Sequence, residues 1–420
     1  MNELPGMQGA WTRRQLIRRG SALAAVGVAM PSILAACGSD TKSSSDTKSS
    51  SDTTAGGSVT TGVASAGAGV SGSEAESLAV FDPTAPKGSP SPHAKILGFP
   101  NPFDAELFLR ISDIFDQVAS ERGGDFVTAI SDGDPAKLVE HLDSFMAQDA
   151  GVLFLTPIEE EATKPGSQKA VEGGVCVFGV FRGFASLQVV EDQYAIGYSQ
   201  GKAAVKWIKD NLGGEAEVAY FNEDMSASIR PRHDGVLAAL AEGGDGIKVV
   251  SDVQVELTTE AGASAMNTIL QAHPDVKVAM GGSGVIAGVY AAFDALGRTK
   301  EADLYLSSIA GGDDALDLIA QGTIYRATFG EPWYMWAYAL AQFSFDWMEG
   351  KSIPRVISAP GGLKEISTPE DATAFKDAMS DPAATWNDPA LRDSYISMYG
   401  NINYDTRDLY WLDAVTKLPS

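Results

Sequence analysis

Short apolar runs alternate with longer stretches of helical periodicity from residue 94 to about residue 330. Nine of these runs are nearly all apolar, which is typical of strands covered by helices on both faces. They are Lys95–Phe99, Phe126–Ile130, Gly151–Leu155, Val175–Val180, Glu217–Phe221, Val249–Val255, Val276–Met280, Leu304–Ile309 and Ile324–Phe329. A helix-length segment follows each run, so the pattern predicts an α/β chain with parallel sheets.

Several predicted helices begin with residues that suit a helix N-terminus. In "DGDPAKLVEHLDSFM", Asp134 stands at the cap and Pro135 at the first helical position, where its missing N–H costs little. "TPIEEEATKPG" places three glutamates, 159–161, in a first turn, which we interpret as a solvated helix start rather than a metal site. Thr368 and Asp388 indicate two further helix starts.

Residues 1–36 are predicted to be an export signal rather than part of the fold. "WTRRQLIRRG" precedes the apolar run "SALAAVGVAMPSILAA", which is short for a membrane span and contains Pro31. Arg13 and Arg14 resemble a twin-arginine motif, and both the twin-arginine and the general export route stay open. The run ends in "LAAC", which resembles a bacterial lipobox and predicts that Cys37 is lipidated. The expected location is therefore extracytoplasmic, at the cell membrane through this lipid anchor.

Residues 37–92 are predicted to form a disordered tether. The segment repeats "SDTKSS" and is rich in Ser, Thr and Gly, with too few large apolar residues to offset the entropy of ordering. Its end, "APKGSPSPH", carries turn-forming prolines. The tether would hold a globular part away from the membrane.

Composition and candidate chemistry argue against several function classes. With 31 Lys and Arg against 55 Asp and Glu, the net charge of −24 repels phosphate backbones, so nucleic acid is not expected as a partner. The four histidines show no metal-type spacing, and "GGSGV" lacks the final glycine of a nucleophile elbow. Cys176 lies in the apolar run "GGVCVFGVF" and is interpreted as a core residue rather than a nucleophile. We therefore expect no enzyme, no metal and no cofactor.

From residue 94 to about residue 358 the chain resembles the type I periplasmic binding proteins, in particular the ribose-binding branch that feeds ABC importers. The segments that carry the resemblance are "NPFD", "SDGDPAKLVEHLDSFMAQDAGVLFLTP", "VVEDQYAIGYSQGKAAVKWI", "SIRPRHDGVLAAL", "QAHPDVKVAM" and "QGTIYRATFGEPW". The resemblance implies two Rossmann-like lobes with parallel sheets, joined by a three-segment hinge. It implies an N-terminal lobe of residues 93–191 and 330–355 and a C-terminal lobe of residues 192–329.

The resemblance also implies a ligand site between the carboxyl ends of the two sheets, where open α/β sheets bind small molecules. The implied ligand-binding residues are Asn101, Phe103, Asp104, Thr156, Phe181, Arg182, Arg232, Ser283, Glu331 and Trp333. Phe103 would be a stacking platform, with a satellite core residue as the alternative. Arg182 and Arg232 match family arginines, and Glu331 stands where the family has a glutamine.

The departures from the family pattern make the implied pocket more apolar and more charged than a hexose site. Phe181 replaces a family Asp, and Ala310 aligns with another. We expect a small sugar-like or polyol ligand, captured by lobe closure and delivered to an ABC transporter permease by a monomer. A sensory protein for a nucleoside-like or cationic molecule is the alternative, and a secreted enzyme on this fold is a third hypothesis. An unpaired Glu331 would be costly, so either an arginine neutralises it or the ligand supplies donors.

Residues 356–420 are predicted to form a hinge crossing and a C-terminal extension beyond the resemblance. The aromatic residues Trp386, Tyr395, Tyr404, Tyr410 and Trp411 favour packing over a mobile tail. We expect this extension to pack on one lobe and to reach the hinge.

Overall fold

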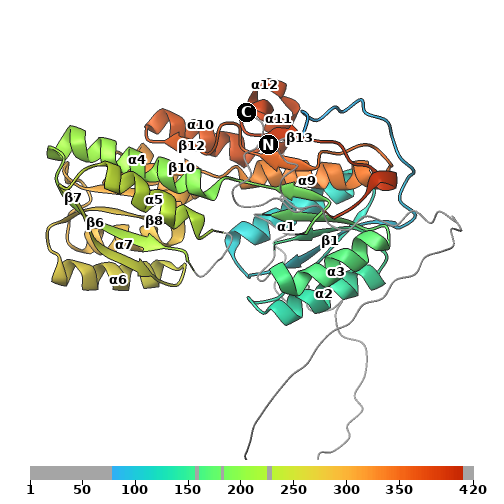
Figure 1. The fold of residues 1–420 in the computed structure, drawn as a ribbon, viewed down its shortest axis with the longest axis horizontal. Coiled ribbons are helices and arrows are strands. Elements are labelled where there is room, and N and C mark those ends of the chain that lie inside the picture. The colour runs from blue at the N-terminus through green and yellow to red at the C-terminus, as the bar shows by residue number, and fades with distance from the viewer. Residues whose placement is uncertain (1–77, 157–159, 181–183, 225–228, 410–420) are drawn as a thin grey trace, which may run out of the picture. The chain divides into compact units, whose positions relative to one another are not determined.

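A computed structural model describes residues 78–156, 160–180, 184–224 and 229–409, all within one unit of the chain, residues 64–420. Its strands form two sheets, each the centre of one lobe (Figure 1). The predicted export signal and Cys37 lie outside the described residues. Over the described ranges, no helix combines the length and apolar character needed to cross a membrane.

The first lobe is built on a seven-stranded sheet in the order β13-β11-β5-β4-β3-β1-β2, parallel except for the pair β11 and β13. Its strands are β1 (Ala94–Asn101), β2 (Asp125–Ile130), β3 (Ala150–Leu155), β4 (Cys176–Val180), β5 (Leu187–Val189), β11 (Val356–Ser358) and β13 (Ser397–Tyr399). Its helices are α1 (Glu106–Glu121), α2 (Pro135–Ala147), α3 (Glu160–Glu172) and α9 (Trp333–Met348). Val152 and Phe154 of β3 pack in one core with α1 and α9, whereas Leu153 and Leu155 pack in another with α2 and α3. This sheet is therefore covered on both faces, as its apolar runs predicted.

The second lobe is built on a six-stranded sheet in the order β12-β10-β9-β8-β6-β7, with β12 antiparallel to β10. Its strands are β6 (Ala216–Asn222), β7 (Ile247–Gln254), β8 (Val276–Gly282), β9 (Tyr305–Ala310), β10 (Tyr325–Gly330) and β12 (Lys364–Ile366). Its helices are α4 (Gln193–Leu212), α5 (Pro231–Glu242), α6 (Thr259–Ala272), α7 (Ser283–Ala295) and α8 (Asp313–Ala320). Figure 1 shows α4 and α5 on one side of this sheet and α6 and α7 on the other.

The chain crosses between the two sheets three times up to β12 and once more to reach β13. It leaves the first sheet after β5, returns after β10 and leaves again between β11 and β12. The α/β fold of two parallel-sheet lobes agrees with the expectation from the sequence. Both Glu191 and Glu331 lie on these crossings, which places them where lobe movement would bend the chain.

The C-terminal extension contacts both lobes, so the expectation that it packs on one lobe is wrong. We call residues 364–399 the strap; they include α10 (Pro369–Ser380), α11 (Pro382–Asn387) and α12 (Pro389–Asp393). In the second lobe, β12 pairs with β10 and Lys376 Nζ lies 2.6 Å from Asp317 Oδ1 of α8. In the first lobe, α11 packs on α9 and β13 pairs with β11. The chain thus returns to the first lobe through the strap, which packs on both lobes.

The last part of the predicted tether, residues 78–92, packs on the protein rather than being disordered. The Phe81 backbone N–H donates to the Met398 carbonyl at 2.9 Å, and the Gly88 N–H donates to the Gly350 carbonyl at 2.9 Å. The Phe81 ring meets the edge of Phe343, with ring centroids 6.0 Å apart. An aromatic anchor and closely spaced prolines distinguish residues 78–92 from the preceding Ser/Thr/Gly repeat and explain their ordered path.

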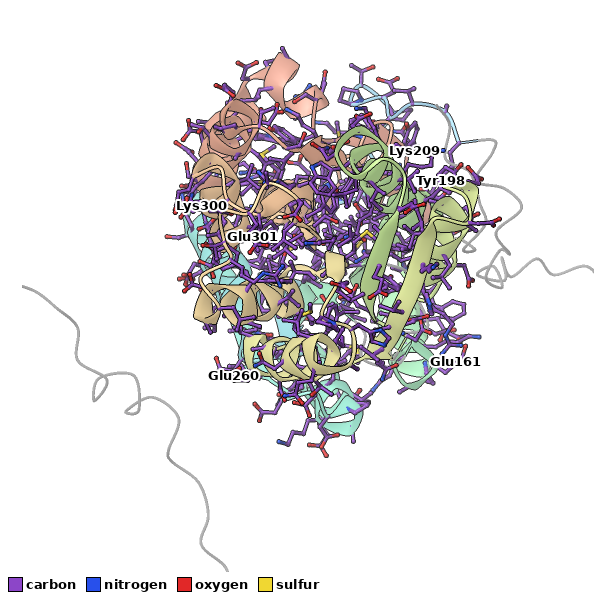
Figure 2. All side chains as sticks on the ribbon, turned by 90° about the vertical axis from the view of Figure 1, so that its left-hand side faces the viewer. Glu161, Tyr198, Lys209, Glu260, Lys300 and Glu301 are labelled. Atoms are coloured by element: carbon purple, nitrogen blue, oxygen red, sulfur yellow. The ribbon has the colours of Figure 1, made fainter. Side chains whose placement is uncertain are left out.

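Local signals in the sequence are confirmed at several positions. The side chains of Asp134, Thr368 and Asp388 accept hydrogen bonds from backbone N–H groups of the helices that follow them. Cys176 is fully buried in β4, and burial raises the pKa of its thiol, as expected for a core residue rather than a nucleophile. Charged side chains such as Glu161 and Lys209 point outward from the ribbon (Figure 2).

Candidate functional site

The first group of predicted site residues follows β1 at the carboxyl edge of the first sheet. Asn101 is buried, and its Oδ1 accepts a hydrogen bond of 3.0 Å from the Phe103 backbone N–H. The Gly133 N–H, from the loop after β2, donates to the Pro102 carbonyl at 2.8 Å. Asp104 is exposed at the end of this turn. These bonds fix the Asn-Pro-Phe-Asp turn to the neighbouring loop.

Phe103 lies on the surface of this turn with 44% of its area exposed. One side of its ring is held by protein, since its centroid lies 6.0 Å from that of Phe108 and a Cβ added at Gly133 would be 3.0 Å from the ring. The alternative of a satellite core residue is therefore excluded. The geometry leaves part of the ring available for stacking.

Two buried hydroxyl groups lie at the same edge of the sheet. Thr156 follows β3 and Ser131 follows β2, the two strands that flank β1. Among the described residues, neither Thr156 Oγ1 nor Ser131 Oγ has a hydrogen-bond partner. A buried hydroxyl without a partner is costly, so both suit a ligand that brings its own polar groups. Thr156 was predicted from the sequence, whereas Ser131 was missed.

Arg232 is the centre of the second group of site residues. It lies in the first turn of α5, is 5% exposed, and directs its guanidinium at three side chains. Its Nε and Nη2 donate to Gln193 Oε1 at 2.9 and 2.6 Å. Its Nη1 lies 2.9 Å from Glu223 Oε2, and its Nη2 lies 3.1 Å from Glu331 Oε1. We call Glu191, Gln193, Glu223, Arg232 and Glu331 the arginine cluster.

Glu331 has a partner for each of its carboxylate oxygens. Arg232 contacts Oε1, and the Trp333 indole Nε1–H donates to Oε2 at 2.7 Å. The expectation that an arginine neutralises Glu331 is confirmed for Arg232. Burial raises the pKa of Glu331, and the Arg232 charge and the Trp333 hydrogen bond oppose that rise. Trp333 itself is buried and meets Trp336 edge-on, so its N–H is committed to the protein.

Two glycines bring Arg232 to Gln193. A Cβ added at Gly197 of α4 would lie 1.9 Å from the Arg232 carbonyl oxygen, and one at Gly235 of α5 would lie 2.2 Å from the Tyr194 carbonyl oxygen. The backbones of α4 and α5 therefore touch directly where Gln193 and Arg232 project. Larger residues at these positions would separate the two helices and lengthen the bonds of the arginine cluster.

Glu191 is the member of the arginine cluster that lacks a hydrogen-bond partner. It is 6% exposed on the crossing after β5, and neither of its oxygens has a partner of good geometry among the described residues. Burial raises the pKa of Glu191 well above its ordinary value, and the nearby charge of Glu331 adds to the rise. The charge of Arg232 and the Gln193 side chain act in the opposite direction.

Ser283 is held inside the protein rather than left open. Its Oγ donates to the Ile309 carbonyl at 2.6 Å and lies 3.2 Å from Ser308 Oγ. The preceding Gly282 lies against the arginine cluster, since a Cβ there would be 2.5 Å from Glu223 Oε1. In the same region Ala310 has φ +99°, a left-handed conformation that side chains rarely adopt. The loop after β8 thus approaches Glu223, and the Glu331 backbone N–H donates to the Ala310 carbonyl at 3.2 Å.

Three predicted residues, Phe181, Arg182 and Cys37, lie outside the described residues. Sequence reasoning missed Glu191, Gln193 and Glu223, although each stands within four residues of a strand's carboxyl end. That position is the signal that could have identified them, because ligand sites of open α/β sheets gather at these ends.

Comparisons with known proteins agree with this architecture. The family profile described as "Periplasmic binding protein domain" matches residues 99–352. The chain is 28% identical over 236 residues to the D-apiose import binding protein of Paraburkholderia graminis, a match that covers 54% of this chain and 73% of that protein. It is 23% identical over 269 residues to the ribose import binding protein of Bacillus subtilis, covering 62% of this chain and 82% of that protein.

A solved structure shows the same fold. It is an ABC transporter solute binding protein from Mycobacterium smegmatis with bound glycerol, which superimposes with a TM-score of 0.58 at 23% sequence identity. The likeness covers 67% of this chain and 96% of that protein. The strap, residues 364–399, lies beyond the family profile, which ends at residue 352.

Proposed function

Because the chain belongs to the periplasmic binding protein family, we propose that it captures a sugar-like or polyol solute by hinged lobe closure and delivers it to an ABC import permease. The observation that carries the proposal is the arginine cluster, in which Arg232 of the second lobe is bonded to Glu331 on a crossing between lobes. The D-apiose and ribose relatives described above are import binding proteins rather than enzymes, which supports a binding role.

We assign residues 93–191 and 330–355 to the N-terminal lobe and residues 192–329 to the C-terminal lobe. Residues 356–420 form the third crossing and the C-terminal extension. A ligand that contacts both lobes favours closure only by its higher affinity for the closed form. A ligand bound at Arg232 would act directly on Glu331, so occupation of the site and bending of a crossing would be coupled.

The polar and aromatic groups of the first lobe define the ligand class. The exposed ring of Phe103 suits one apolar face of a sugar or cyclic polyol. The hydroxyls of Thr156 and Ser131 suit ligand hydroxyl groups, and Arg182 and Arg232 suit oxygen acceptors. Asn101 fixes the turn that carries Phe103, and Asp104 lies beside it. Both groups of residues stand at carboxyl ends of strands, the usual place for such a site.

For the cellular location we propose export by the signal in residues 1–36 and anchoring through lipidated Cys37. The support is the sequence "LAAC" after an apolar run with two arginine pairs before it. The segment up to residue 77 would then link the anchor to the lobes.

A thermal-shift screen over pentoses, hexoses, polyols, nucleosides and cationic metabolites tests the proposed function. A ligand at 100 times its dissociation constant adds about 2.7 kcal/mol, or roughly 4 °C in Tm for a protein of this size. Phe103→Ala should weaken binding about tenfold while leaving Tm unchanged, because the ring is half-exposed.

Leu109→Ala is the matched control, since Leu109 of α1 is also 44% exposed but lies on a helix outside the site. Equal affinities of the two variants for the ligand identified by the screen would remove Phe103 from the site. Stabilisation by nucleosides or metabolites alone, with every sugar and polyol inert, would overturn the proposed solute class.

A further inference from the structure

Two carboxylates, those of Glu223 and Glu331, contact one guanidinium where the chain crosses between lobes, and a third, that of Glu191, lies on another crossing. Glu191 follows β5, Glu223 follows β6 and Glu331 follows β10. The side chains of Arg232 and Glu331 are each 6% exposed, and that of Glu223 is 13% exposed. The cluster is therefore shielded from water, where unbalanced charge is costly.

Arg232 satisfies only part of this acidic group. It contacts Glu223 and Glu331 and gives two further N–H bonds to Gln193, but none to Glu191. Both oxygens of Glu191 are buried without a hydrogen-bond partner among the described residues. If all three carboxylates are ionised, the cluster carries an excess of negative charge that Arg232 alone does not balance.

The carboxylates do not form a metal site. Over the described residues, no group of three His, Cys, Asp or Glu side chains has the closeness needed to hold a metal ion. An organic cation fits better, because an ammonium group can contact one carboxylate while the rest of the molecule engages other polar groups. The position of Glu191 on one crossing and Glu331 on another places that cation at the hinge.

We propose that the natural ligand is a polyhydroxylated molecule with a protonated amine, an amino sugar or aminocyclitol, whose ammonium group binds Glu191. This inference rests on the proposed function, since it assumes a ligand held between the lobes at the arginine cluster. The ammonium supplies the hydrogen bonds and the positive charge that the described residues do not give Glu191, and the hydroxyls engage Arg232 and the first lobe. A bound cation would also relieve the repulsion between Glu191 and Glu331.

Matched pairs of ligands test the charge directly. We would measure affinities by isothermal titration calorimetry at pH 7 for D-glucosamine with D-glucose, D-galactosamine with D-galactose, 3-amino-3-deoxy-D-ribose with D-ribose and scyllo-inosamine with scyllo-inositol. In at least one pair the amine should bind about tenfold or more tightly than its neutral partner. Glu191→Gln should abolish that preference, so that the two members of the pair bind with affinities within about threefold of each other.

Glu301→Gln is the control variant. Glu301 also pairs with an arginine, Arg298, at 2.8 Å, but it precedes β9 and lies on the outside of the protein (Figure 2). It should leave the preference for the amine intact. Glu191→Gln should in addition raise the Tm of the ligand-free protein, because it removes a buried charge without a partner.

The outcomes separate the two proposals. Neutral members that bind as tightly as the amines in every pair would overturn the ammonium assignment and leave the proposed function standing. A lowered Tm for Glu191→Gln would also overturn it, since Glu191 would then already have a cationic partner in the protein. Binding of no sugar or cyclitol from either series would overturn both proposals.

Discussion

The direct contact between α4 and α5 makes Gly197→Ala a sharp test of how Arg232 is positioned. A Cβ at this position would lie 1.9 Å from the Arg232 carbonyl oxygen and 2.7 Å from the carbonyl carbon. Real Cβ contacts essentially never fall under 3.0 Å, so something must shift. Both opposing atoms belong to the backbone, so no side-chain rotation relieves the contact and the helices must separate by about 1 Å.

Two opposing contributions set the change in the free energy of unfolding caused by Gly197→Ala. Overpacking costs about 1–3 kcal/mol, and a rigid backbone contact belongs at the upper end of that range. Alanine in place of glycine inside a helix recovers about 1 kcal/mol. The expected net loss is about 2 kcal/mol in the free energy of unfolding, or roughly 3 °C in Tm for a protein of this size. Because Gln193 and Arg232 project from the separating helices, ligand affinity should fall as well.

Guanidinium unfolding followed by circular dichroism measures the stability, and calorimetry with the ligand from the screen measures the affinity. Gly166→Ala in α3 is the control, because its Cβ would meet only Leu142 Cδ2 at 2.9 Å, the end of a flexible side chain. It should leave stability unchanged or slightly raised and affinity unchanged. A Gly197→Ala protein with wild-type stability and wild-type affinity would refute the argument that this contact positions Arg232.

Three further predictions concern charge and anchoring. Burial raises the pKa of Glu191 in the folded protein, so the wild type loses stability relative to Glu191→Gln as the pH rises above the ordinary glutamate pKa. The Tm of the variant should therefore exceed that of the wild type by more at pH 8 than at pH 4.5. An equal difference in Tm at both pH values would contradict the raised pKa. Glu331→Gln should cost a neutral hydroxylated ligand less than about 1 kcal/mol of affinity and a cationic ligand about 2 kcal/mol or more, measured by calorimetry. Cys37→Ser should release the protein from the membrane fraction or leave its signal uncleaved, and full membrane association after signal removal would count against lipidation.

The main elements could be predicted from the sequence because they are locally encoded. All nine predicted strands are present, and seven of them are largely buried apolar runs, whereas the edge strands β2 and β7 contain no buried residue. Caps such as Thr368 could be predicted for a similar reason, because an oxygen and the N–H it accepts lie three residues apart. The strands β5, β11, β12 and β13 were missed. Each has three residues, too few to show a period, and their existence depends on partners far away in the sequence.

The candidate site was predictable only in part. Arg232, Glu331 and Trp333 were expected from the family resemblance, but their mutual contacts were not. Arg232 is 39 residues from Gln193 and 99 residues from Glu331, so only the packed fold brings them together. Glu191 was missed because nothing in the local sequence separates it from Asp192, the neighbouring acid that caps α4. Its lack of a partner is a property of the surroundings rather than of the local sequence.

The short strands of the strap also affect how the protein meets other copies of itself. β12 and β13 each pair over three residues with β10 and β11, and outside β13 the Phe81 and Gly400 N–H groups bond to Met398 and Ala79. An open strand edge presents unpaired N–H and C=O groups on which another chain can add a strand and begin to aggregate. Here those groups are occupied by segments too short to serve as a template. A chain ended at residue 358 would expose the edges of β10 and β11, and we expect it to self-associate during folding.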